Sequence, residues 1–260
     1  MINSAATWAD GSLLAFDLET TGTDTAVDRV VTATVVSIRP GREPITRTWL
    51  ADPGVEIPAE STEIHGISTE HARQHGRPAA DVVAEVAAAL AEEWSPDTPL
   101  CVFNAVFDLS MLHAELRRHH GRDLELGGPV VDPLCIDRHV DRYRKGKRTL
   151  GALCEHHRVR HDGAHTSTGD ALAAARVAWR LARDYPAEVG QVPLDVLHTR
   201  QIEWHRTRTL GFADYLERQG RRAADPAEAA ELARRAAGVR MEADHWPLRT
   251  EPLPETAVGA

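Results

Sequence analysis

The order of apolar segments in this 260-residue chain predicts an α/β domain built around a mixed five-stranded sheet, followed by a C-terminal helical extension. Three runs rich in β-branched and apolar residues open the chain, with turn residues between them. Short apolar runs then alternate with segments of helical spacing, and from about residue 190 only helical spacing remains. We therefore expect an α/β domain over residues 1–188, and a helical extension with a flexible tail over residues 189–260.

The first three strands are expected at residues 13–17, 30–38 and 45–50. Thr20, Thr21 and Gly22 form a turn after the first run, and Pro40 with Gly41 closes the second. We therefore expect these strands to form an antiparallel meander.

The later elements should alternate between helices and strands, so that helical crossovers join the remaining strands. Helical segments are expected at residues 69–73, 79–94, 106–119, 150–156, 171–183, 194–219 and 227–239, with another beginning at Pro133, and strands at residues 100–103 and 130–131. Thr168 is the expected N-cap of the helix that carries Asp170. Residues 252–260 have the composition of a disordered tail.

Composition limits the class of protein. A content of 42% hydrophobic residues is sufficient for a sizeable core. The chain shows neither a signal-peptide pattern nor an apolar run near the roughly 20 residues that cross a bilayer, so we expect a soluble, cytoplasmic protein with no membrane partner. The three cysteines have no CxxC spacing and are expected to be buried, reduced thiols: Cys101, Cys135 and Cys154.

The formal net charge of -9 argues against a nucleic-acid partner, because phosphate binding usually goes with a basic excess. Bound metal would neutralise part of this acidity, however, and the acidic clusters of the helices fit solvated faces. A local basic stretch at residues 138–148 is followed by Arg200, Arg206 and Arg208. Such stretches are more often solvated than functional, but this one comes just before an expected active-site segment, which strengthens the alternative that it contacts a phosphate backbone.

Acidic side chains mark the candidate site. Asp17 and Glu19 are two residues apart on an expected strand, so their carboxylates point to the same face. Asp108 and Asp170 lie in the first turns of two expected helices. Carboxylate oxygens are the ligands that hard divalent cations prefer, and a pair of cations needs carboxylates from several segments. The pattern predicts a metal site if the four segments converge.

The motifs together closely resemble the DEDDh group of 3′-to-5′ exonucleases, the class of the bacterial DNA polymerase III epsilon proofreading subunit, RNase T and oligoribonuclease. The resemblance covers about residues 11–185 and rests on five motifs in order: residues 16–22, 64–67, 104–108, 150–154, and His165 followed by Asp170 and Ala171. It implies an RNase H-like fold, which agrees with the order of elements expected above.

The resemblance also implies roles for individual residues. Asp17, Glu19, Asp108 and Asp170 would bind two divalent metal ions, Mg²⁺ or alternatively Mn²⁺, and His165 would be the general base. The backbone of Thr20, Thr21 and Gly22 would receive the terminal nucleotide, with His65, Asn104 and Phe107 lining the pocket. The partner would be a nucleic acid with a 3′ end, preferably single-stranded, from which nucleoside 5′-monophosphates are released.

Several alternatives remain open at this level. The substrate could be DNA, or RNA and short oligonucleotides. A different class of function is a nucleic-acid-binding module attached to a DNA polymerase, with the C-terminal helices as its docking element. His65 could be a structural turn residue, and His161 lies in the same loop as His165. The sequence departs from many relatives at Phe103, where histidine is common, and in the small residues between His165 and Asp170.

Overall fold

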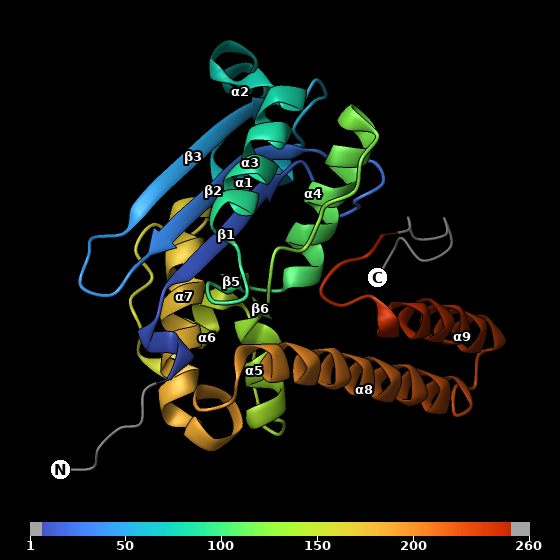
Figure 1. The fold of residues 1–260 in the computed structure, drawn as a ribbon. Coiled ribbons are helices and arrows are strands. Elements are labelled where there is room, and N and C mark those ends of the chain that lie inside the picture. Colours follow the sequence, from blue (N-terminus) through green and yellow to red (C-terminus); the bar gives the residue numbers. More distant parts are fainter. Residues whose placement is uncertain (1–6, 251–260) are drawn as a thin grey trace.

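The computed structural model describes residues 7–250 and contains a six-stranded sheet in the order β4-β3-β2-β1-β5-β6 (Figure 1). Its strands are β1 Leu13–Thr20, β2 Val30–Ile38, β3 Ile45–Asp52, β4 Arg77–Pro78, β5 Leu100–Cys101 and β6 Val130–Val131. The pairs β1·β2 and β2·β3 are antiparallel, whereas the other three pairs are parallel. The mixed sheet and its opening meander are thus confirmed. The expected number of five strands was wrong, because the two-residue strand β4 adds to the edge of β3 and contains a proline, which has no strand signature.

Helices cover both faces of the sheet (Figure 1). They are α1 Ala59–His65, α2 Thr69–His75, α3 Ala79–Glu93, α4 Ala105–His120, α5 Pro133–Val140, α6 Leu150–His157, α7 Ser167–Asp184, α8 Leu194–Gly220 and α9 Pro226–Met241. Short 3-10 or π turns lie at Trp8–Asp10, Pro186–Gly190 and Glu242–Asp244. Sequence analysis did not predict α1, and residues 252–260, expected to be a tail, lie outside the described residues.

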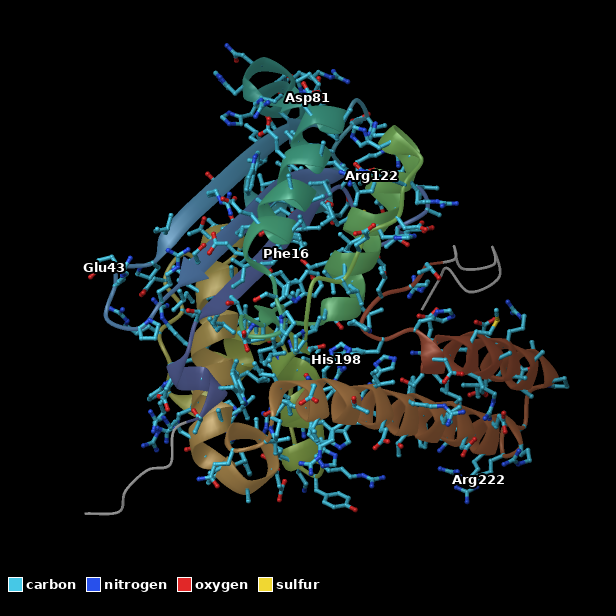
Figure 2. All side chains as sticks on the ribbon, viewed as in Figure 1. Phe16, Glu43, Asp81, Arg122, His198 and Arg222 are labelled. Carbon is cyan, nitrogen blue, oxygen red and sulfur yellow. The ribbon has the colours of Figure 1, made fainter. Side chains whose placement is uncertain are left out.

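Strand β1 supplies side chains to both layers of the core with a period of two. Its even-numbered residues, such as Phe16, pack into the cluster that includes α3 and α4, and Figure 2 labels Phe16 at the centre of the sheet. Leu13 and Ala15 pack into the second cluster, with α7. The same alternation places Asp17 and Glu19 on the α7 face of the strand.

The start of α7 corrects one expectation. The N-cap is Thr166, whose side chain accepts a hydrogen bond from the Gly169 N–H, and not Thr168. Thr168 already lies within the helix, where its hydroxyl is 3.2 Å from that of Thr34 on β2. Asp170 still lies in the first turn, as expected.

Helix α8 covers the free edge of β6. His198 Nδ1 accepts the N–H of Val130 at 3.0 Å, and His198 lies at the start of α8 where the helix meets the domain (Figure 2). The buried Gln201 side chain accepts the Asp132 N–H and donates to the carbonyls of Val130 and Leu197. Side chains of the extension therefore satisfy backbone groups that an edge strand would leave without partners.

The three cysteines are buried and free, in agreement with the sequence. Within residues 7–250, no helix combines the length and the apolar character that a membrane span requires.

Replacing Gln201 should destabilise the fold. Gln201→Ala leaves the Asp132 N–H and the Val130 carbonyl without a hydrogen-bond partner. Each unsatisfied buried polar group lowers the free energy of unfolding by about 1–3 kcal/mol. We expect the free energy of unfolding in urea to fall by at least about this amount. Gln219→Ala is the matched control, because the Gln219 side chain in the same helix makes no hydrogen bond to the described residues. Equal stability of the two variants would contradict this role for Gln201.

Candidate active site

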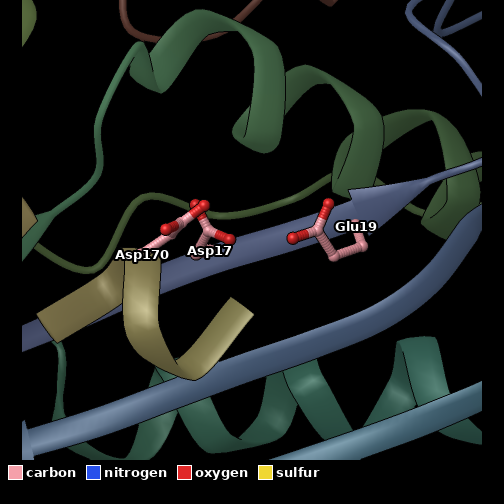
Figure 3. Close-up of side chains that lie close together, drawn as sticks. All are labelled: Asp17, Glu19 and Asp170. Carbon is pink, nitrogen blue, oxygen red and sulfur yellow. The ribbon is translucent and has the colours of Figure 1, made fainter. Parts of the chain in front are cut away.

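Three carboxylates from two distant segments meet beside β1. Asp17 and Glu19 on β1 and Asp170 on α7 each offer an oxygen, and these oxygens all lie within 4.8 Å of one another (Figure 3). All three residues are half-buried. The structure thus brings together three of the four carboxylates expected to bind metal, although Asp170 follows Asp17 by about 150 positions.

Hydroxyl groups fix the first turn of α7 against the sheet. Thr34 pairs with Asp17 in the β1·β2 register, and its Oγ1 lies 2.7 Å from Oγ of Ser167. Gly169 is required because a Cβ there would lie 2.1 Å from the Gly163 carbonyl oxygen. These contacts hold Asp170 close to Asp17.

Asp108 lies on α4 and reaches β1 from the face of the sheet opposite to α7. It is buried in the first turn of α4, and its Oδ1 accepts the N–H of Leu18 on β1 at 3.0 Å. Asp108 lies outside the group of three oxygens within 4.8 Å. It is close enough, however, for its charge to act on Asp17.

Asp132 fixes the position of α4. Its carboxylate accepts the N–H groups of Asn104 and Ala105 at 3.0 and 3.1 Å, and it also caps α5. Asn104 has a left-handed backbone (φ 63°), which asparagine tolerates better than most residues. Sequence analysis missed the role of Asp132. Its place after a strand and before Pro133, the first residue of α5, is typical of an N-cap and was the available signal.

The carboxylates are electrostatically unfavourable without a counterion. Removal from water, then the negative charges of Asp108, Asp170 and Glu19, raise the pKa of Asp17 well above its usual range. Burial and the charge of Asp170 raise the pKa of Glu19 to about 7. Burial likewise raises the pKa of Asp108, although the Leu18 N–H opposes this shift. A set of hard oxygen donors with excess negative charge fits divalent cations such as Mg²⁺ and Mn²⁺.

The histidine nearest to this cluster is His161. Its Nε2 lies 2.5 Å from Asp170 Oδ1. His165 is exposed and has a positive φ of 63° in the loop before α7. The expected role of His165 as general base stays a prediction, and the geometry adds His161 as a second histidine at the site.

The residues expected to receive a nucleotide lie around the end of β1. The Thr20 hydroxyl donates to the Gly22 carbonyl, and Ser61 of α1 donates to the Thr21 carbonyl at 2.8 Å, so the turn is fixed to α1. His65 at the end of α1 is buried, and its Nδ1 accepts the Ile67 N–H, which supports a structural role.

Asn104 and Phe107, the remaining residues of the expected pocket, lie at the start of α4 and line a large groove. The proposed contacts of all these residues with a nucleotide stay predictions.

A comparison with protein families agrees with this arrangement. The RNase T family model, described as Exonuclease, matches residues 14–178, which is more than half of the chain. The chain belongs to this exonuclease family. The matched region contains all of β1 except its first residue, the whole of α4 and the first turn of α7, and it includes all four of the acidic residues.

Curated relatives of this family member include polymerases. The DNA polymerase III PolC-type of Streptococcus sanguinis is 26% identical over 196 residues, which cover 75% of this chain and 13% of the polymerase. The corresponding protein of Streptococcus pneumoniae is 27% identical over 188 residues, or 72% of this chain and 12% of the polymerase. The chain thus matches only a small part of the length of these relatives.

Solved structures of exonucleases share the fold. Escherichia coli exonuclease I in complex with a dA16 oligonucleotide has a TM-score of 0.59 at 20% identity, over 75% of this chain and 44% of that one. Exonuclease I of Methylocaldum szegediense has a TM-score of 0.53 at 23% identity, over 68% and 41% of the two chains. These similarities confirm the RNase H-like fold.

The metal-free protein should show the repulsion at Glu19 as a pH dependence of stability. Because the pKa of Glu19 rises from 4.5 to about 7 on folding, its ionisation destabilises the fold, and this effect develops as the pH rises from about 4.5 to about 7. Glu19→Gln removes the charge. We expect its Tm in EDTA to be close to that of the wild type at pH 5 and to exceed it by a few degrees at pH 8.

The control is Glu63→Gln, which neutralises an exposed glutamate of α1 outside the acidic cluster. Its Tm difference from the wild type should change little over the same range. A Tm difference for Glu19→Gln that does not vary with pH would contradict the electrostatic account.

Proposed function

We propose that this protein is a metal-dependent 3′-5′ exonuclease that hydrolyses phosphodiester bonds at the 3′ end of a single-stranded or frayed nucleic acid. The observation that carries the proposal is the convergence of Asp17, Glu19 and Asp170, with Asp108 bonded to the same strand. Membership of the exonuclease family supports it. The proposed products are nucleoside 5′-monophosphates.

The chemistry follows from the donor set. A phosphodiester is anionic, so the carboxylates alone would repel it. Two divalent cations, when bound, would supply the charge that offsets this repulsion, lower the pKa of water and stabilise the leaving oxygen. Asp17, Glu19, Asp108 and Asp170 would hold them. The hydrogen bonds of Thr34 with Ser167 and of Asp108 with Leu18 keep the metal-binding carboxylates in place before substrate binds.

A general base is the remaining requirement. His165 has the spacing to Asp170 that characterises the family resemblance, and it lies on an exposed loop from which it can reach a substrate. Removal of a proton by a positioned histidine typically contributes about 10² to 10⁴ in rate. We assign this role to His165, and the contact of His161 with Asp170 makes His161 the second candidate.

The proposed substrate is single-stranded DNA. Two observations favour it over RNA: the PolC-type relatives are DNA polymerases, and E. coli exonuclease I has been solved with single-stranded DNA and with dA16. Trimming of RNA or short oligonucleotides is the alternative substrate class. A polymerase is a proposed partner on the same grounds, and a cytoplasmic location is expected.

Removal of one central carboxylate should abolish activity. We expect Asp17→Ala to lower kcat on single-stranded DNA with Mg²⁺ by a factor on the order of 10³ or more, because the lost charge stabilisation is worth several kcal/mol. The metal-free variant should fold at least as stably as the wild type, since a repelled carboxylate is gone. Asp97→Ala is the control, because Asp97 is exposed outside the cluster. Full activity of Asp17→Ala on both DNA and RNA would contradict the site.

The two histidines can be separated by mutation. His165→Ala should reduce kcat by about 10² to 10⁴ and leave the affinity for Mn²⁺ in calorimetry nearly unchanged, because His165 is not a proposed ligand. His161→Ala should reduce kcat far less. The reverse order of the two effects would transfer the role of base to His161, and lost Mn²⁺ binding in His165→Ala would make it a ligand.

A further inference from the structure

A groove of about 1060 Å³ lies between the start of α4, α5 and the C-terminal extension, next to the acidic site but not lined by its carboxylates. One wall is the start of α4 with Asn104 and Phe107, another is α5 with the loop after it, and the third is α8 with Trp204 and Arg208. The volume exceeds the roughly 300–1,000 Å³ of common small-ligand pockets. The groove therefore fits an extended ligand that passes along it.

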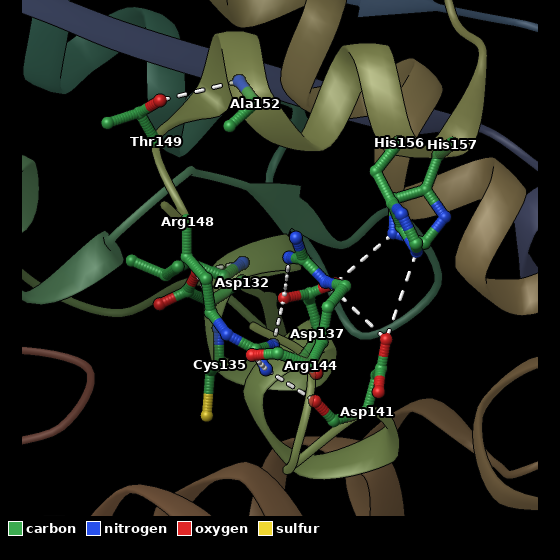
Figure 4. A network of polar contacts seen from close by, with 11 residues as sticks. Asp132, Cys135, Asp137, Asp141, Arg144, Arg148, Thr149, Ala152, His156 and His157 are labelled. Atoms are coloured by element: carbon green, nitrogen blue, oxygen red, sulfur yellow. Dashed lines mark hydrogen bonds and ion pairs between the residues drawn. The ribbon is translucent and has the colours of Figure 1, made fainter. Parts of the chain in front are cut away.

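Six arginines line this groove, and three of them are neutralised by carboxylates. Arg144 and Arg148 both donate to the buried Asp137, at 2.9 and 2.5 Å (Figure 4). Burial would raise the pKa of Asp137, but hydrogen bonds from His157, Arg144 and Arg148 outweigh it and lower this pKa. Arg249 pairs with Glu242. These ion pairs fix the loop after α5 and the walls of the groove. They also neutralise the three arginines, which therefore have little charge left to attract a ligand.

The other three groove arginines are Arg138 on α5, Arg142 in the loop after α5, and Arg208 on α8. Within residues 7–250, none of these three guanidinium groups makes an ion pair or a hydrogen bond, and the buried Nε of Arg138 has no acceptor. Arg142 is exposed and lies over the Tyr143 ring, whereas Arg138 and Arg208 are partly removed from water, which also lowers the pKa of Arg208. Burial and the nearby charge of Arg208 lower the pKa of Arg138 to about 10. Two unpaired cations from different parts of the fold thus face one groove, at an electrostatic cost that an anion would remove.

The groove and the acidic site lie at the same edge of the sheet. Both begin where the parallel strands β1, β5 and β6 end, and Phe107 of the groove directly precedes Asp108. A nucleic acid strand with its 3′ end at the carboxylates would continue into this groove if its upstream part ran along α4 toward α8. Bidentate donation by arginine suits phosphate oxygens.

We infer that Arg138 and Arg208 bind the phosphodiester backbone of the substrate strand upstream of its 3′ end, so that α8 of the C-terminal extension is part of the substrate-binding surface. The inference rests on the proposed exonuclease function. It adds that the preferred substrate is an unpaired strand several nucleotides long, held by its backbone and therefore with little dependence on base sequence.

The aromatic residues of the groove support backbone rather than base recognition. His139 stacks on Trp204 at 3.9 Å with nearly parallel rings, so this face of the indole is already covered. Trp204 also packs against the α7 core cluster. The carboxylates in the groove wall are Asp132, which is saturated by backbone N–H groups, and the exposed Glu203.

The test compares the hydrolysis of three substrates of different length by one enzyme. The p-nitrophenyl ester of thymidine 5′-monophosphate reaches only the carboxylate site, whereas a single-stranded oligothymidylate also reaches the groove. In the Arg138→Ala/Arg208→Ala double variant, the ratio of kcat/KM for the oligonucleotide to that for the ester should fall about tenfold to a hundredfold, as expected when charge-assisted hydrogen bonds to phosphate are removed. A thymidine dinucleotide should show a much smaller change.

Salt dependence gives a second readout of the same phosphate binding. The slope of log Kd against log salt for oligothymidylate, measured in Ca²⁺, should decrease by about 0.7 for each phosphate that the variant no longer neutralises. Arg218→Ala is the matched control, because Arg218 is exposed on α8, makes no ion pair with the described residues and does not line the groove. This variant should retain the wild-type ratio and slope.

The outcomes are distinguishable. If the double variant hydrolyses the ester normally and keeps the wild-type substrate ratio and salt slope, the proposed binding of the strand in the groove is wrong. The proposed exonuclease site is not affected by this result. An equal loss for ester, dinucleotide and oligonucleotide would also overturn the proposed binding in the groove, because the arginines would then support the carboxylate site structurally. No hydrolysis of any substrate by the wild type would instead reject the proposed function.

Discussion

Mutual repulsion of carboxylates is the constraint on which this structure depends. Asp17, Glu19 and Asp170 hold like charges within 4.8 Å, where a pair repels by about 1 kcal/mol in water and by several times more near a protein interior. The fold maintains this arrangement through the β1·β2 ladder, the cap at the start of α7 and the bond from Leu18 to Asp108. The raised pKa values of Asp17 and Glu19 reflect the repulsion that a pair of divalent cations would relieve.

The C-terminal extension is connected to this site through backbone groups. Gln201 and His198 of α8 satisfy the free edge of β6, and the residue after β6 is Asp132, which fixes the start of α4 and hence Asp108. The expected division at residue 188 follows the change in sequence character, but these hydrogen bonds cross it. The proposed contact of Arg208 with substrate gives the same helix a second role, so that α8 would support the catalytic carboxylates and extend the surface that binds the strand.

Local sequence patterns were sufficient to predict most of the fold and the carboxylates of the candidate site. The period of two in β1 predicted that Asp17 and Glu19 share a face, and helical spacing predicted α3, α4, α7 and the extension. The sequence could not reveal β4, since two residues with a proline have no strand pattern, and it did not reveal the pairing of Gln201 with β6 across 71 positions. The choice between His161 and His165 depends on the path of one loop, which spacing alone cannot determine.

The most direct test of the central claim is a crystal of the protein soaked in Mn²⁺ and measured at the manganese absorption edge. Two anomalous peaks are expected about 3.5 to 4 Å apart, bounded by the carboxylates of Asp17, Glu19, Asp108 and Asp170. A map without anomalous density among these oxygens, or with the ions bound only elsewhere, would contradict the central claim.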